Sequence, residues 1–128
     1  MRMLGWALGL SLVTAVFSSS ARAYTGNEIY ADMQAQAGSY EASRALSYVR
    51  GAIDSANFFA ALDLSVNKHH TMVYLCFPEG VTNGQAFDVV KKYLVDNPSE
   101  RNATAATLTM IALARTWGCS PTPKPSAP

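Results

Sequence analysis

Cysteine and histidine are the residue types in this chain whose possible chemistry is easiest to narrow down. The 128 residues include two cysteines, Cys76 and Cys119, and two adjacent histidines, His69 and His70. Neighbouring side chains diverge on an extended or turning backbone, and no third histidine exists to complete a ligand set. We therefore favour a solvated loop over a metal site at the histidine pair, and we expect no cofactor.

Carboxylates are the other groups that could perform chemistry. Asp32, Asp54, Asp63 and Asp88 could supply an acid–base pair, but on helices they fall on faces that we expect to be solvated. Arg50 lies one turn before Asp54, which favours a surface ion pair. The sequence has no phosphate-binding glycine loop, no Gly-x-Ser-x-Gly and no His-Glu-x-x-His. We predict a binding protein rather than an enzyme.

The first 23 residues have the pattern of a secretory signal peptide. A short positive start at residues 1–3 precedes an apolar run from Leu4 to Phe17, and residues 18–23 end in Ala-x-Ala. The alternative is an uncleaved membrane anchor, but about 14 apolar residues are fewer than the roughly 20 that span a bilayer. We expect cleavage after Ala23.

Export changes the net charge of the chain and the expected redox state of its two cysteines. Removing residues 1–23 takes away Arg2 and Arg22, so ten basic residues become eight against nine acidic ones, a net charge of −1. No basic field remains to attract nucleic acid. Two thiols in an oxidising compartment are expected to pair, so we predict a Cys76–Cys119 disulfide. By loop-closure entropy such a bond contributes on the order of 4 kcal/mol.

The remaining sequence predicts an all-α fold, a small single-domain bundle of about four helices with one disulfide. Thr25 and Glu28 have the spacing of a capping box for a first helix that ends near Gln36. Ser39 is the expected cap of the second helix, whose apolar residues recur at steps of three and four as far as Phe59 or Ala60. We expect Gly51, inside this helix, to mark a close approach of another backbone.

The second half of the chain has clearer start and stop signals. The periodicity lapses between Asp63 and Thr71, which predicts a loop. Thr82 and Gln85 form a second capping box, and the third helix that it starts ends at Asn97-Pro98. A fourth helix is expected from Ala103 to Trp117, with Gly118 as its terminating residue. The proline-rich residues 120–128 predict a disordered or extended tail after a domain of residues 24–119.

The residues that carry a family resemblance lie in four segments: residues 24–28, residues 48–54, residues 76–85, and the stretch from Val90 through Tyr93, Leu94 and Pro98 to the alanine-rich helix ending at Cys119. Together they resemble the Rap/Tai family of immunity proteins of type VI secretion. The most specific part is the Cys76–Gln85 motif in combination with Cys119. Many members of that family carry a further cysteine pair in the first helical hairpin, which this chain lacks.

The resemblance implies a periplasmic, all-helical effector inhibitor that binds a peptidoglycan amidase, occludes its cysteine–histidine cleft, and tends to form a homodimer. The alternative is a periplasmic chaperone or assembly factor that binds several clients weakly through exposed apolar surface. For the partner-binding residues we select Asn67, Lys68, His69 and His70, because they fall in the longest non-periodic stretch of the domain. A plain solvated connection is the competing interpretation of this stretch.

Overall fold

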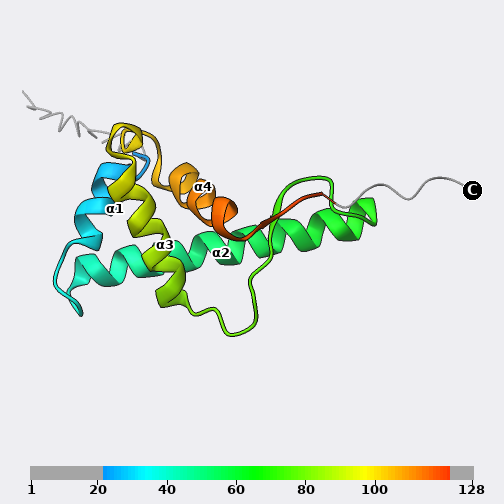
Figure 1. Ribbon diagram of the computed structural model, residues 1–128, viewed down its shortest axis with the longest axis horizontal. Coiled ribbons are helices and arrows are strands. Elements are labelled where there is room, and N and C mark those ends of the chain that lie inside the picture. Colours follow the sequence, from blue (N-terminus) through cyan, green and yellow to red (C-terminus); the bar gives the residue numbers. More distant parts are fainter. Residues whose placement is uncertain (1–21, 122–128) are drawn as a thin grey trace, which may run out of the picture.

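The computed structural model describes residues 22–121, so most of the predicted signal peptide and of the predicted tail lies outside the described residues. Four α-helices dominate the fold (Figure 1), and the all-α prediction is confirmed. The elements follow the order α1 (Gly26–Met33), α2 (Tyr40–Asn67), β1 (Tyr74–Leu75), α3 (Asn83–Asp96), the 3-10 helix η1 (Pro98–Glu100), α4 (Ala105–Trp117) and β2 (Gly118–Cys119).

Both predicted capping boxes are present. The Thr25 hydroxyl accepts a hydrogen bond from the Glu28 N–H at 3.3 Å, and the Glu28 carboxylate accepts one from the Thr25 N–H at 2.8 Å. Thr82 and Gln85 make the same reciprocal pair at the start of α3. Each box satisfies two backbone groups that would otherwise lack partners, so local sequence fixes where these two helices begin.

Helix α2 is much longer than the apolar pattern predicted. Ser39 caps it as expected, but it continues to Asn67, so the loop predicted between Asp63 and Thr71 is wrong for its first four residues. The helix ends because Lys68 adopts a left-handed conformation with φ 63° and donates its N–H to the Leu64 carbonyl. Apolar periodicity reports burial against a core, and it lapses here because this part of α2 leaves the core (Figure 1).

The core lies where α1, the first half of α2, α3 and α4 meet. Its fully buried side chains include Ile29, Val49, Val90, Leu94, Leu108 and Leu113. The predicted close contact at Gly51 is wrong, because a Cβ placed there would have no neighbour within 4 Å. The tight position is Gly26, where a Cβ would lie 2.3 Å from the Leu108 side chain.

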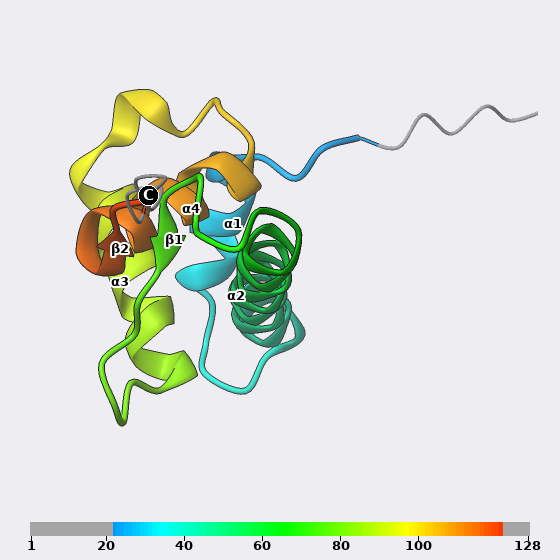
Figure 2. The ribbon, with the colours of Figure 1, turned by 90° about the vertical axis from the view of Figure 1, so that its right-hand side faces the viewer.

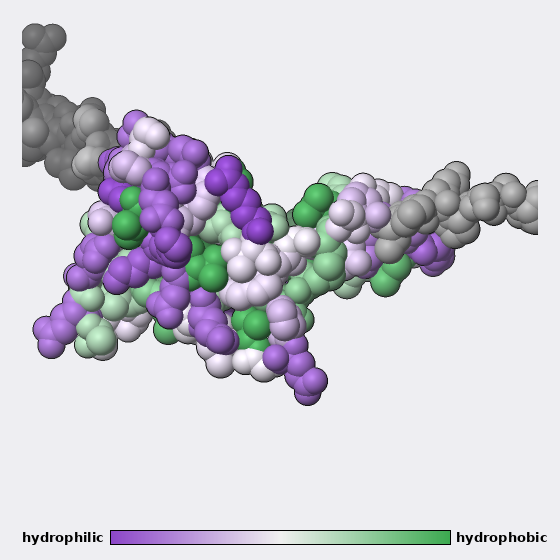
Figure 3. All heavy atoms as spheres, viewed as in Figure 1, coloured by the Kyte–Doolittle hydropathy of each residue, from purple (hydrophilic) through white to green (hydrophobic). Residues whose placement is uncertain are grey.

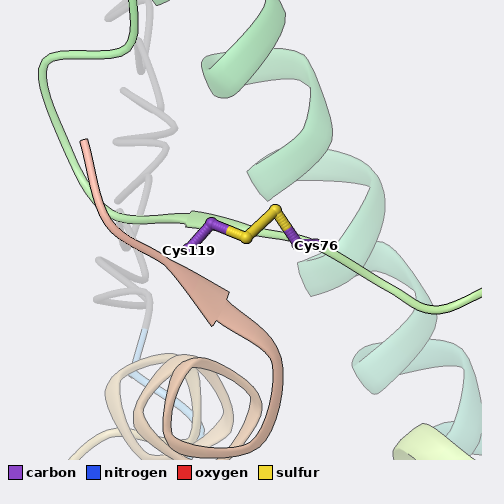
Figure 4. Close-up of a disulfide and its surroundings, with 2 residues drawn as sticks. All are labelled: Cys76 and Cys119. Atoms are coloured by element: carbon purple, nitrogen blue, oxygen red, sulfur yellow. A yellow bond between two sulfur atoms is a disulfide. The ribbon is translucent and has the colours of Figure 1, made fainter. Parts of the chain in front are cut away.

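Two short strands and the disulfide close the fold. β1 and β2 pair antiparallel, with Tyr74 opposite Cys119, and in a view along α2 the strand β1 lies between β2 and α2 (Figure 2). The Cys76–Cys119 bond is present, with Cα atoms 5.8 Å apart (Figure 4). Gly118 follows α4 but does not form a left-handed turn, since its φ is −72°. Glycine is needed at this position because a Cβ would lie 2.3 Å from the Ala114 carbonyl oxygen.

Candidate interaction surface

The four residues selected from the sequence, Asn67, Lys68, His69 and His70, lie at the end of the projecting half of α2, and we call them the tip. Asn67 is the last helical residue, Lys68 turns the chain, and the two histidines begin its return. Asn67 and Lys68 are exposed, while His69 and His70 are half-buried. The structure therefore brings the four residues together at one end of a long helix rather than in a separate loop.

The carboxylate of Asp63 holds the tip in place. It accepts hydrogen bonds from the Thr71 N–H, the Thr71 hydroxyl and the Asn67 amide, each at 2.7 Å. These bonds, led by that of the Thr71 hydroxyl, lower the pKa of Asp63 to about 2. Asp63 is buried, so the expectation that it lies on a solvated face is wrong. An ionised group at this position ties both ends of the tip to one turn of α2.

Lys68 and His70 are also positioned by neighbours. The Lys68 ammonium donates to the Ser65 carbonyl at 2.6 Å, which places a positive charge at the carbonyl end of α2. The His70 ring stacks on the Tyr74 ring, with centroids 3.8 Å apart and planes inclined by 22°. Within residues 22–121, no three His, Cys, Asp or Glu side chains lie close enough together to hold a metal ion.

The chain returns from the tip through residues 71–82, which we call the arm. A groove of about 780 Å³ lies between α2, the arm and α4. Small and apolar side chains dominate its lining, and Asp63 is the only charged residue among them; the main contributors are Ala52, Ala56, Ala60, Met72, Leu75, Met110 and Ala114. Because Asp63 already bonds to Thr71 and Asn67, the groove can contact a partner only through weakly polar surface.

Apolar side chains also cover the outside of the projecting half of α2 and the adjoining arm. Phe58 is 63% exposed and Val66 is 68% exposed, and they are joined by Phe59, Leu62, Leu64, Met72 and Val73. Figure 3 shows hydrophobic residues along this half of the molecule. A helix face that is exposed to solvent normally carries polar residues instead. An exposed group of apolar side chains is typical of an interaction site. Sequence reasoning missed it, because Phe59 was assigned to the buried stripe and Leu64 and Val66 were assigned to a loop.

The opposite end of α2 carries a cluster of polar and aromatic groups. Asp32 is buried and accepts two hydrogen bonds from the Arg44 guanidinium, at 2.7 and 2.8 Å, and one from the Tyr24 hydroxyl. The bonds from Arg44 lower the pKa of Asp32 below its usual range, although burial opposes the shift. Asp32 was expected on a solvated face, and that expectation is wrong; its bonds assign it a structural role.

The structure also tests the surface ion pair that the sequence predicted on α2. Arg50 and Asp54 are both exposed, and no ion pair joins them within the described part of the chain, so the expected pair is wrong. Lys92 and Asp96 form the one-turn pair instead, at 2.8 Å. None of the helices between residues 22 and 121 is long and apolar enough to cross a bilayer.

Comparison with known proteins identifies a family. The sequence model of the family described as Rap1a immunity proteins matches residues 25–119. No curated protein and no solved structure matches the chain. The matched range begins at the cap of α1 and ends at the second cysteine, so it includes the bundle, the tip, the arm and the disulfide.

Proposed function

The chain belongs to the family of Rap1a immunity proteins, and on that premise we propose that it inhibits a peptidoglycan amidase injected by type VI secretion. Membership implies a non-enzymatic protein that binds a secreted effector. The finer proposal is that the tip enters the cysteine–histidine cleft of the amidase while the surface beside it excludes the substrate. Such an inhibitor needs a stiff protruding element and complementary surroundings, not chemistry of its own.

The observation that carries this proposal is the attachment of the tip. Three hydrogen bonds to Asp63 and the bond from Lys68 to Ser65 fix an exposed, polar turn at the end of a 28-residue helix. An element that is ordered before binding loses less conformational entropy when it enters a cleft. A plain solvated connection would not need an ionised carboxylate devoted to its two ends.

The cellular setting follows from the same proposal. We propose that residues 1–23 are a signal peptide removed after Ala23 and that residues 24–119 act in the periplasm. The disulfide supports an oxidising compartment, because thiols in the cytosol are kept reduced. The target amidase would act on the cell wall from the same compartment.

A matched pair of loop replacements tests the tip. The first variant replaces Asn67, Lys68, His69 and His70 by glycine and serine. Its control replaces Ser99 by glycine and Asn102 by serine. Those two residues belong to the Asn97–Asn102 connection, on the opposite side of the molecule in Figure 1. We expect the first variant to keep its far-ultraviolet circular dichroism and to lose both amidase binding and protection. If only the second variant loses protection, the contact lies at residues 97–102 instead.

The exposed apolar half of α2 supports a second contact. We propose that it pairs with the same surface of another copy in a homodimer, because surfaces of this kind on a small protein are normally covered. A chaperone that binds several clients would use the same surface. Analytical ultracentrifugation of the wild type and of a Phe58→Ser, Leu62→Ser variant tests the homodimer, and a dimer that is lost in the variant supports pairing. A monomeric wild type that suppresses the aggregation of unrelated proteins supports the chaperone instead.

A further inference from the structure

The arm contributes little to the core of the protein. Among the described residues, thirteen apolar side chains are buried in one cluster, and Leu75 is the only one of them that lies in the arm. The other twelve lie on α1, α2, α3 and α4, where each helix packs against the others. The bundle can therefore keep nearly all of its buried apolar surface if the arm moves away.

Apart from the packing of β1 against α2 and the stacking of Tyr74 on His70, few contacts other than the disulfide hold the middle of the arm. The β1–β2 ladder is two residues long, the Cys76 N–H donates to the Trp117 carbonyl at 2.7 Å, and the Phe77 ring lies 5.2 Å from the Trp117 ring. Each of these contacts joins the arm to the end of α4. The Cys76–Cys119 bond joins the same two segments, as Figure 4 shows.

A proline limits the growth of the ladder. The bond from Cys76 to Trp117 places the backbone groups of residues 117 and 119 toward β1, so those of residue 121 would face β1 next. Residue 121 is a proline. A proline has no N–H to donate, so residue 121 cannot reinforce the arm by extending β2.

We infer that the Cys76–Cys119 bond is a redox clamp for the surface beside the tip, so that the protein binds its effector more tightly in the oxidised state. With the bond reduced, the four-helix bundle stays folded, Thr71 stays on Asp63, and residues 72–78 leave α4. The groove then loses the wall formed by Met72–Leu75. The inference rests on the proposed function, since the arm and the groove belong to the surface beside the tip that is proposed to exclude the substrate of the amidase.

The chemistry of the clamp is thiol–disulfide exchange. Closing the bond removes two protons and two electrons from the two thiols, and a disulfide-bearing oxidoreductase of the export compartment accepts them and becomes a dithiol. Before export the chain carries two thiols and an open groove. The clamp would thus keep an unexported copy from acting as an inhibitor.

Limited proteolysis of the purified full chain tests the clamp without the amidase. Chymotrypsin can cut after Tyr74 in the arm, and Phe87 in α3 is a half-buried control site in the same chain. We expect dithiothreitol, or the pair of substitutions Cys76→Ser and Cys119→Ser, to raise cutting in the arm at least about tenfold while cutting at Phe87 and the far-ultraviolet circular dichroism stay unchanged. Unchanged cutting in the arm would overturn the inference, as would a loss of helical signal, which would show that the bond supports the whole fold.

Titration calorimetry with a purified Cys–His amidase, its catalytic cysteine replaced by alanine, tests the functional half. We expect the oxidised chain to bind and the Cys76→Ser, Cys119→Ser chain to bind at least about tenfold more weakly, because the groove wall is no longer ordered. Equal affinities would overturn the redox control. If the oxidised chain does not bind, the proposed function fails, while the proteolysis still decides whether the bond clamps the arm.

Discussion

The two halves of α2 share one helical geometry but differ in what surrounds them. In the first half Ala45 and Val49 are fully buried against the other helices. In the second half the apolar residues, including Phe58 and Leu64, are exposed, and the only buried side chain is the Asp63 carboxylate. The first half therefore packs within the chain, whereas the second half carries the tip and an exposed apolar surface. Substitutions matched between the halves should separate stability from binding.

The largest contrast is expected from matched leucine truncations. Leu113→Ala, in the core beside the first half of α2, should lower the free energy of unfolding by about 2–5 kcal/mol, because it leaves a cavity. Leu64→Ala, at a residue 45% exposed in the second half, should change it by less than about 0.5 kcal/mol. Urea denaturation at low protein concentration measures both. Similar losses for the two variants would mean that the second half is also part of the folding core.

The buried carboxylate at the packed end comes next. Asp32→Asn removes the charge that two Arg44 bonds and Tyr24 satisfy, and should cost about 1–3 kcal/mol. The folded-state pKa of Asp32 is depressed, so its contribution is present above the pKa of the unfolded chain and is lost as pH falls through the folded value. The difference in stability between wild type and variant should therefore shrink in acid. A difference that grows in acid would contradict the assigned pairing.

Sequence reasoning predicted the packed half well and the projecting half poorly, for a physical reason. Capping boxes such as Thr82 with Gln85 are local, and apolar periodicity reports a core, so helix starts and the buried stripe were within reach. Asp63 was missed because its partner Thr71 becomes a neighbour only after α2 has continued to Asn67. The role of Gly51 was predicted wrongly, because a glycine in a helical sequence does not indicate whether its Cβ position faces a neighbouring element or solvent.

The hydrogen bonds that hold the tip should depend on the ionisation of the Asp63 carboxyl group. Because the pKa of Asp63 is lowered to about 2, its bonds to Thr71 should be intact above pH about 4 and lost as pH falls through about 2. The amide chemical shift of Thr71, followed by NMR, should have its midpoint near that lower value. In Asp63→Asn the same shift should not titrate, and amide exchange at residues 68–71 should accelerate. A midpoint near 4 in the wild type would mean that the tip is not held by this carboxylate.

The smallest effect is expected at Gly51, and its contrast with Gly26 distinguishes packing from exposure most directly. Gly51 lies in a helix interior with open space at the Cβ position, so Gly51→Ala should stabilise the protein by about 0.5–1 kcal/mol through helix propensity. Gly26→Ala should instead destabilise it, because the new methyl group would lie 2.3 Å from the Leu108 side chain and 2.8 Å from the Arg101 carbonyl oxygen. Thermal unfolding of both variants measures the signs. Gly51 also lines the groove, so amidase titration of the stabilised Gly51→Ala protein adds a second readout: affinity lost despite higher stability would place the partner's contact in the groove, whereas unchanged affinity would confine it to the tip.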